Sequence, residues 1–247
     1  MNFEDMINTI TLGNSYELIK SIPDKSIDLI LIDPPYDFHC GSVAGIFKNR
    51  IVKPGMEIVE KNINHGFDMN ILQEFVRILK NINIFLWCNT EQVKDYLNFF
   101  DKYNTTFEIL TWHKTNPTPL TKNTYLPDTE YCLYFREKGK VILNDGYELK
   151  SKYYISPSNV ADKDKFKHPT IKPLEIIKKQ ILHTTQKNDI VLDCFSGSGT
   201  TCVAAKELDR RFIGIEIDSE YYKISIDRLN GILANGQISF DTDTSKL

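Results

Sequence analysis

Short apolar runs that end in turn residues alternate along the chain with segments of helical periodicity. The run at 27–32 is apolar at all but one position, and 82–88 and 189–193 are built around similar runs. Such runs indicate strands buried on both faces of a parallel sheet. Apolar residues at helical spacing follow Asp68 and again Thr90. The pattern therefore predicts an α/β fold.

The other expected elements follow from the same periodicities and from capping residues. Ser15 and Asp68 are predicted to cap helices, and Pro173 is predicted to occupy a first helical position. Residues 113–119 are expected to form a loop and 138–168 an irregular segment. The further strands expected are 9–12, 105–112, 130–136 and 211–217. The helices expected are 15–22, one after Asp68, 90–100 with Val93, Leu97 and Phe100 inside, 173–184, one ending at 208, and 219–233.

The stretch Asp33-Pro34-Pro35-Tyr36 directly follows the first long apolar run. Two prolines end the strand and stiffen the loop, because proline fixes φ and lacks an N–H. The loop lies at the carboxyl end of a strand, where open α/β sheets bind ligands. Asp33 and the Pro34 carbonyl could accept hydrogen bonds from both N–H groups of an amine conjugated to a base. Tyr36 could stack on the ring of that base. The stretch therefore indicates a catalytic loop acting on a base.

A second informative stretch is a strand, a glycine-rich turn, a helix and a strand that ends in an acid. The turn runs from Phe195 to Thr201, and the second strand carries Glu216 near its end. Glycines let a cofactor approach the backbone, and a carboxylate after the second strand can accept both ribose hydroxyls. A dinucleotide fold needs more strands after this unit than the remaining residues provide. The unit therefore predicts a nucleotide site of another kind.

Composition narrows the class of protein. The chain has 247 residues and a formal net charge of −3, so nucleic-acid binding requires a local basic surface. No apolar run is long enough to span a membrane, and a cytoplasmic protein is expected. The five cysteines have no metal-binding spacing, so no metal is expected. Basic residues with aromatic residues between them occur in 138–168, a composition that fits either a nucleic-acid contact or a solvated insertion. The long loop 37–66 is likewise interpreted either as a substrate contact or as a solvated surface loop.

Taken together, the motifs resemble those of an S-adenosylmethionine-dependent DNA amino-methyltransferase of the beta group. Besides the two stretches above, Leu12-Gly13-Asn14-Ser15, Trp112-His113-Lys114-Thr115-Asn116-Pro117-Thr118-Pro119 and His168-Pro169-Thr170-Ile171-Lys172-Pro173 resemble family motifs in family order. The resemblance implies a Rossmann-like methyltransferase sheet with helices on both faces, permuted motif order and a small recognition insertion.

The resemblance also implies a role for individual residues. The catalytic set would be Asp33, Pro34, Pro35 and Tyr36. The residues expected to bind S-adenosyl-L-methionine are Asn14, Thr170, Lys172, Asp193, Phe195, Gly197, Ser198, Gly199, Thr200 and Glu216. The residues expected to bind DNA are Lys114, Asn116, Lys163, Lys165 and Lys167.

Two positions depart from the family pattern. The family usually has an acid where this chain has Asn14, and a proline where it has Cys194. Residues 1–247 are expected to form one methyltransferase domain, with a mobile loop at 37–66 and target recognition at 138–166. The target sequence is not readable from one chain. The resemblance leaves open whether the protein is a homodimer and whether it has a cognate restriction endonuclease.

The reaction expected is methyl transfer to the N6 amine of adenine in DNA. Asp33 favours adenine, because cytosine-N4 enzymes more often have serine there and protein-amide enzymes asparagine. Cytosine-N4, RNA or protein-amide methylation and an inactive DNA-binding subunit are the alternatives. Methylation of cytosine carbon 5 requires a cysteine placed after a proline, and no cysteine of this chain follows one.

Overall fold

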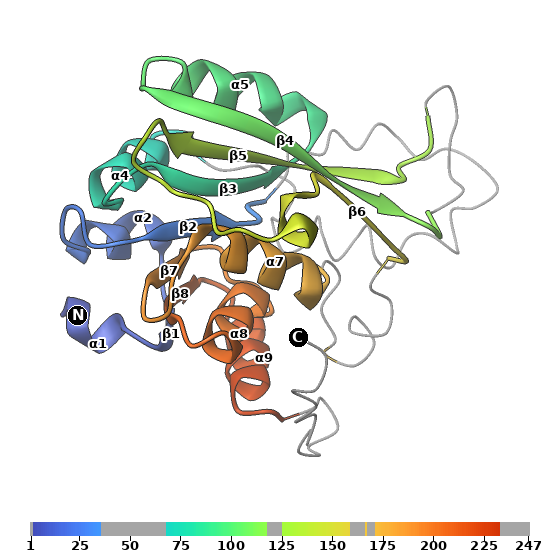
Figure 1. Ribbon diagram of the computed structural model, residues 1–247. Helices are drawn as coiled ribbons and strands as arrows, with labels where there is room; N and C mark the ends of the chain where they lie inside the picture. The colour runs from blue at the N-terminus through green and yellow to red at the C-terminus, as the bar shows by residue number, and fades with distance from the viewer. Residues whose placement is uncertain (1, 36–67, 118–124, 159–165, 167–170, 233–247) are drawn as a thin grey trace.

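A computed structural model describes residues 2–35, 68–117, 125–158, 166 and 171–232 (Figure 1). Its centre is an eight-stranded sheet in the order β1-β8-β7-β2-β3-β5-β4-β6. Every strand pairing is parallel except those of β5, which runs antiparallel to β3 and β4. The strands are β1 (Thr9–Leu12), β2 (Leu29–Ile32), β3 (Asn83–Cys88), β4 (Thr105–Lys114), β5 (Thr129–Glu137), β6 (Tyr153–Ser156), β7 (Ile190–Asp193) and β8 (Arg211–Glu216).

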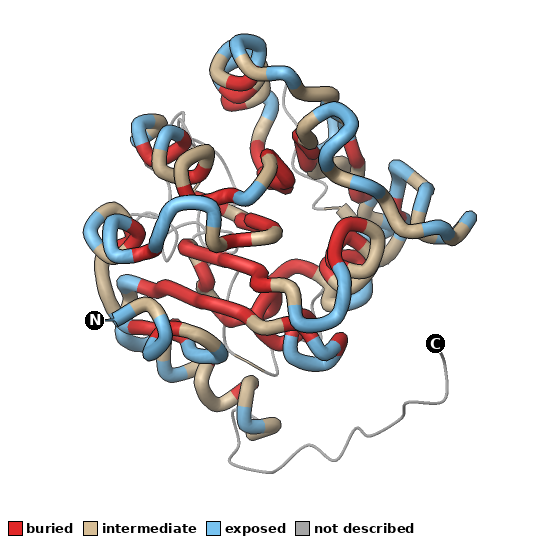
Figure 2. Tube along the Cα trace, turned by 60° about the vertical axis from the view of Figure 1, so that its left-hand side comes forward, coloured by how far each residue is buried: buried red, intermediate tan, exposed pale blue. Residues whose placement is uncertain are grey.

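Helices cover both faces of this sheet, as predicted. One apolar cluster joins the sheet to α1, α2, α4 and α5, and a second joins its other face to α7, α8 and α9. The central strands are buried throughout, which Figure 2 shows as red segments between the helices. The helices are α1 (Phe3–Met6), α2 (Ser15–Leu18), η1 (Ile19–Ser21), α4 (Ile71–Ile78), α5 (Thr90–Phe100), η2 (Tyr147–Lys150), α7 (Leu174–Thr184), α8 (Thr200–Glu207) and α9 (Ser219–Leu229).

Alternation within β2 explains why the strand reads as a continuous apolar run. Ile30 and Ile32 belong to one apolar cluster, whereas Leu29 and Leu31 belong to the other. Successive side chains of a strand point to opposite faces, so a strand covered on both sides needs apolar residues at every position. The sheet direction then brings the carboxyl ends of seven strands, and the start of β5, to one edge.

Several local predictions about helix ends are wrong. The cap of α2 is Asn14, whose Oδ1 accepts from the Tyr16 N–H at 2.9 Å, whereas Ser15 Oγ donates to the Cys194 carbonyl. The helix itself is α-helical only to Leu18, after which one 3₁₀ turn follows. Pro173 occupies the N-cap of α7 and lies one residue before its first helical position.

Further differences concern two strands and three helices. Strand β4 continues through Lys114 into the predicted loop, and β6 pairs with it inside the segment expected to be irregular. The N-cap of α4 is Asn70, and Asp68 accepts a hydrogen bond from its N–H. Helix α5 buries Gln92, Tyr96 and Phe100, while Val93 and Leu97 are half-buried. Helix α1 was not expected.

Within the described ranges, no helix is long and apolar enough to cross a membrane. The same ranges contain no group of three or more His, Cys, Asp or Glu side chains that could hold a metal ion. Four cysteines are described, and all four are buried free thiols: Cys88, Cys132, Cys194 and Cys202. Burial raises the pKa of each of these thiols, so none is set up as a thiolate nucleophile.

Candidate active site

Asp33 emerges from the carboxyl end of β2 and forms an ion pair with Lys172, the residue two positions before α7. The distance from Lys172 Nζ to Asp33 Oδ2 is 2.5 Å. The lysine side chain is only 7% exposed, and its Nζ also lies 5.1 Å from the centre of the Trp87 ring. Burial by itself lowers the lysine pKa, but Asp33 and Glu130 outweigh burial and raise it. Lys172 is therefore held as a buried cation.

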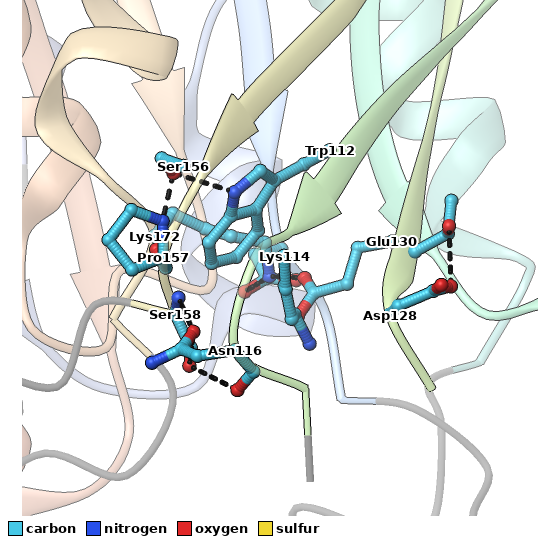
Figure 3. Close-up of polar contacts among 11 residues, drawn as sticks. Trp112, Lys114, Asn116, Asp128, Glu130, Ser156, Pro157, Ser158 and Lys172 are labelled. Carbon is cyan, nitrogen blue, oxygen red and sulfur yellow. Dashed lines mark hydrogen bonds and ion pairs between the residues drawn. The ribbon is translucent and has the colours of Figure 1, made fainter. Parts of the chain in front are cut away.

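The acid Glu130 stands between two lysines. Its Oε1 lies 2.6 Å from Lys114 Nζ, and its Oε2 lies 3.1 Å from Lys172 Nζ (Figure 3). Burial would raise the carboxyl pKa, yet Lys172 and Lys114 lower it to about 2. Sequence reasoning missed Glu130 because it counted only as the first residue of a strand. The available signal was an acid at the start of an otherwise apolar run.

The Trp-x-Lys-x-Asn segment at the end of β4 forms hydrogen bonds with the last residue of β6 and with the chain that follows it (Figure 3). Trp112 Nε1 donates to Ser156 Oγ at 2.8 Å. Asn116 Oδ1 accepts from the Ser158 N–H at 2.6 Å and from Ser158 Oγ at 2.7 Å. Two of the residues expected to bind DNA, Lys114 and Asn116, are therefore engaged by protein groups in this structure.

The glycine-rich turn follows β7, whose last residue, Asp193, is a buried acid. Asp193 is 4% exposed and accepts from the Phe195 N–H at 3.1 Å. Burial raises the pKa of its carboxyl to about 7, and the nearby acids Asp33 and Glu216 act in the same direction. The turn itself needs glycine, because Gly197 and Gly199 have φ of 50° and 77°.

Glu216, at the end of β8, is fixed by backbone donors. Its Oε2 accepts from the Gly197 N–H at 2.6 Å, and its Oε1 accepts from the Asp218 N–H at 2.8 Å. Burial nevertheless raises the pKa of this carboxyl above its ordinary value. Strand β1, the neighbour of β8 in the sheet, leads directly into the Leu12-Gly13-Asn14-Ser15 motif. The Gly13 N–H of this motif donates to the Glu216 carbonyl at 2.8 Å. Asn14 therefore lies beside the acid and the turn.

Arg228 of α9 is a buried contact of the turn that the sequence analysis did not select. Its Nη1 donates to the Ser198 carbonyl at 2.7 Å, to Ser198 Oγ at 2.8 Å and to Thr200 Oγ1 at 2.9 Å. The guanidinium also lies 4.5 Å from the centre of the Phe166 ring. No sequence pattern marks an arginine in a helix more than twenty residues beyond the turn as one of its supports.

One cavity contains groups from both halves of the site. Asp33 and Lys172 line it together with residues of the β7 end and the turn. Asn116 and the turn residue Gly199 are not among its lining residues, and Glu216 supports the turn from outside the lining by accepting from the Gly197 N–H. The predicted site residues in the lining are Asp33, Lys172, Asp193, Phe195, Gly197, Ser198 and Thr200. Tyr36, Thr170, Lys163, Lys165, Lys167 and the loop 37–66 lie outside the described residues.

This chain is similar to known proteins along most of its length. The model of a family described as DNA methylase matches residues 27–227. The Type II methyltransferase M2.LlaDCHI of Lactococcus lactis subsp. cremoris is 33% identical over 237 residues, covering 88% of this chain and 87% of that protein. M2.MboI of Moraxella bovis is 31% identical, with coverage of 93% and 90%. A crystal structure of an M1.HpyAVI–SAM complex is 27% identical, with a TM-score of 0.67 and coverage of 90% and 98%.

Proposed function

The chain belongs to the DNA methylase family, and from this premise we propose that it transfers a methyl group from S-adenosylmethionine to the N6 amine of adenine in DNA. The observation that carries the proposal is the shared cavity. It unites the Asp33 carboxylate, at the end of β2, with the glycine-rich turn after β7. An acceptor for an amine and a cradle for a methyl donor are the two parts that such a transfer requires.

The charges around the turn fit this cofactor. Asp193 and Glu216 are buried acids on either side of the turn, and both have raised pKa values because they are desolvated. A ligand that carries positive charge and a ribose diol would relieve that cost, since carboxylates accept from hydroxyls and attract cations. A dinucleotide would instead bring its anionic pyrophosphate toward two acids. S-adenosylmethionine, with its sulfonium, ammonium and ribose, suits these two acidic acceptors.

The residues given to the cofactor share the work as follows. Glu216 accepts from the ribose hydroxyls, Asp193 and the turn residues Gly197, Ser198, Gly199 and Thr200 hold the methionine part, and Phe195 packs beside it. Asn14 accepts from the adenine amine, although its Oδ1 also caps α2. Thr170 and Lys172 complete the set. The bound cofactor supplies an electrophilic methyl group on its sulfonium.

On the substrate side, Asp33 and the Pro34 carbonyl accept hydrogen bonds from the two N–H groups of the target amine. This draws the nitrogen lone pair out of the purine ring and toward the methyl group. The nitrogen then forms its bond to carbon as the carbon–sulfur bond breaks, and Asp33 can accept the proton that the nitrogen loses. Pro35 keeps the loop stiff, and Tyr36 stacks on the extruded base, a contact worth roughly 1–3 kcal/mol.

Residues 1–247 form a single methyltransferase domain in this proposal. Two segments of it that lie outside the catalytic core recognise the DNA. Residues 138–166 are the proposed recognition insertion, aided by the loop 37–66, and β6 gives the insertion a fixed edge against β4. The insertion and the β4 end supply the proposed DNA-binding residues Lys114, Asn116, Lys163, Lys165 and Lys167. A homodimer, a cognate restriction endonuclease and a cytoplasmic location complete the proposal.

Mass spectrometry of nucleosides tests the reaction directly. DNA incubated with the protein and labelled cofactor should yield labelled N6-methyl-2′-deoxyadenosine, and Asp33→Ala should abolish the product while cofactor binding persists. Asp28→Asn is the matched control, because Asp28 precedes the same strand and pairs with Lys80 away from the cavity. Labelled N4-methylcytosine, or full activity of Asp33→Ala, would contradict the proposal. Tyr36→Phe should retain most activity and Tyr36→Ala should not.

A further inference from the structure

Glu130 belongs to none of the motifs that define the site, yet it contacts the cation that contacts Asp33. Ion pairs connect Lys114, Glu130, Lys172 and Asp33 in that order, at 2.6, 3.1 and 2.5 Å. We propose that Glu130 is a positioning residue for methyl transfer, which holds Lys172 in place and shares its charge so that Asp33 keeps its strength as an acceptor. The inference rests on the proposed function, because it concerns the same carboxylate.

The sheet explains why the acid is at this edge. Strand β5 is antiparallel to both neighbours, so its first residues lie where the other strands end. Glu130 pairs with Trp112 near the end of β4, and the next residue, Tyr131, pairs with Cys88 at the end of β3. Glu130, the second residue of β5, therefore lies at the same edge as Asp33, which directly follows β2. Asp33 and Glu130 therefore reach Lys172 because of the direction of their strands, and not because they belong to one loop.

The burial of Lys172 makes its second partner significant. Removing an ammonium from water costs several kcal/mol, and one partly exposed carboxylate offsets only part of that cost. Two carboxylates stabilise the cation from two directions, and Lys114 balances the second of them. The four groups together carry no net charge. The arrangement is a neutral network, in which each ion is paired and Lys172 is held at a defined position.

The chemical consequence concerns the acceptor. A cation bound to Asp33 alone would concentrate its charge on that carboxylate and weaken it as an acceptor for the amine. Glu130 draws on the same ammonium, and this competition leaves more negative charge available at Asp33. Asp193 also interacts electrostatically with Asp33, as do the buried thiols of Cys88 and Cys132. The groups facing Asp33, directly or through Lys172, are Lys172, Glu130, Lys114, Asp193, Cys88 and Cys132.

Glu130→Gln tests the inference because it keeps the shape and removes the charge. We expect kcat at saturating DNA to fall about tenfold or more, as for a displaced catalytic group, while the KM for the cofactor changes less than about twofold. The acid limb of the kcat profile should move to lower pH, since losing a nearby anion favours ionised Asp33. Lys114→Gln removes a cation and should move the limb to higher pH. Glu137→Gln, at the opposite end of β5, should do neither.

A readout without turnover separates this inference from the proposed function. Carbon NMR of the aspartate carboxyls, with Asp33 assigned through Asp33→Asn, follows ionisation of Asp33 in each variant. A lower pKa in Glu130→Gln and a higher one in Lys114→Gln support the inference even if the wild-type product is methylcytosine. Unchanged ionisation in both variants overturns it even if adenine is methylated. A loss of kcat equal at every pH, without movement of the limb, also overturns it.

Discussion

Gly199 lies directly against Ser225, which joins the glycine-rich turn to α9. A Cβ placed on Gly199 would lie 2.9 Å from Ser225 Cβ, closer than such atoms approach in proteins. Ser225 is fully buried, and its Oγ donates to the Tyr222 carbonyl, so it has little room to withdraw. The position thus excludes side chains for two reasons, its φ of 77° and this contact.

Gly199→Ala should therefore combine strain with a clash. Strain at a positive φ costs about 1–3 kcal/mol, and the displacement of α9 adds to it. Gly139→Ala is the matched control, because Gly139 has a φ of 69° and nothing within 4 Å of its added Cβ. In urea denaturation, the free energy of unfolding should fall more for Gly199→Ala than for Gly139→Ala. The double variant Gly199→Ala/Ser225→Gly should recover part of that loss. Equal losses at the two glycines would mean that packing against Ser225 is unimportant.

Arg228 provides a second prediction about the turn. Arg228→Met retains the aliphatic length but removes donors from Ser198 and Thr200, leaving buried oxygens without their charged partner, at about 1–3 kcal/mol. Because the turn loosens, cofactor affinity measured by calorimetry should fall about tenfold, which is equivalent to 1.4 kcal/mol. Arg211→Met, whose guanidinium donates to the Asn188 carbonyl at an exposed position, is the control. Unchanged affinity in Arg228→Met would show that the turn holds its shape alone.

The sequence predicted those parts of the fold that depend on local patterns. Strand β2 is recognisable because both of its faces are buried, and the turn after β7 because glycine is needed at two positive φ values. Both features leave a mark within a few residues. The family resemblance implied helices on both faces of the sheet, and the structure confirms that expectation.

The remaining features depend on residues far apart in the chain. Strand β6 has the burial pattern of an edge strand, exposed at two of its four positions, and its pairing with β4 determines it more than its own composition. Ser15 was expected to cap a helix, but its hydroxyl bonds to the Cys194 carbonyl 179 positions away. Glu130 and Arg228 likewise act through the sheet order and through α9. No short-range signal specifies such partners.

Lys172 should contribute strongly to stability as well as to the site. Lys172→Met leaves Asp33 and Glu130 near each other with one cation fewer, and breaking a buried pair in this way costs roughly 3–5 kcal/mol. Lys187→Met is the control, because the side chains of the Lys187–Asp209 pair are 72% and 68% exposed. Breaking this exposed pair should leave the free energy of unfolding unchanged. Urea denaturation at neutral pH measures both. A loss no larger than that of the control would mean that Lys172 is not needed to neutralise the two acids.

Protonation of Asp193 should make the stability of the protein depend on pH. Burial raises the pKa of this carboxyl to about 7 in the folded protein, while the unfolded chain has an ordinary, lower value. Between about pH 4 and pH 7 the folded state therefore binds more protons than the unfolded state, and stability falls as pH rises through that window. Asp193→Asn should flatten this fall in urea denaturation at pH 5 and pH 8. Glu216, whose pKa is also raised, should account for part of any slope that persists.

The same proton links cofactor binding to pH. A cationic ligand favours the ionised carboxylate, so S-adenosylmethionine should bind more tightly at pH 8 than at pH 6 and should release protons on binding near pH 6.5. Calorimetry in two buffers of different ionisation enthalpy measures that release. Asp193→Asn should abolish most of it, whereas Asp101→Asn, at an exposed position beyond α5, should retain it. Proton release that is the same in wild type and Asp193→Asn would assign the linkage to another group and remove Asp193 from the proposed contacts of the cofactor.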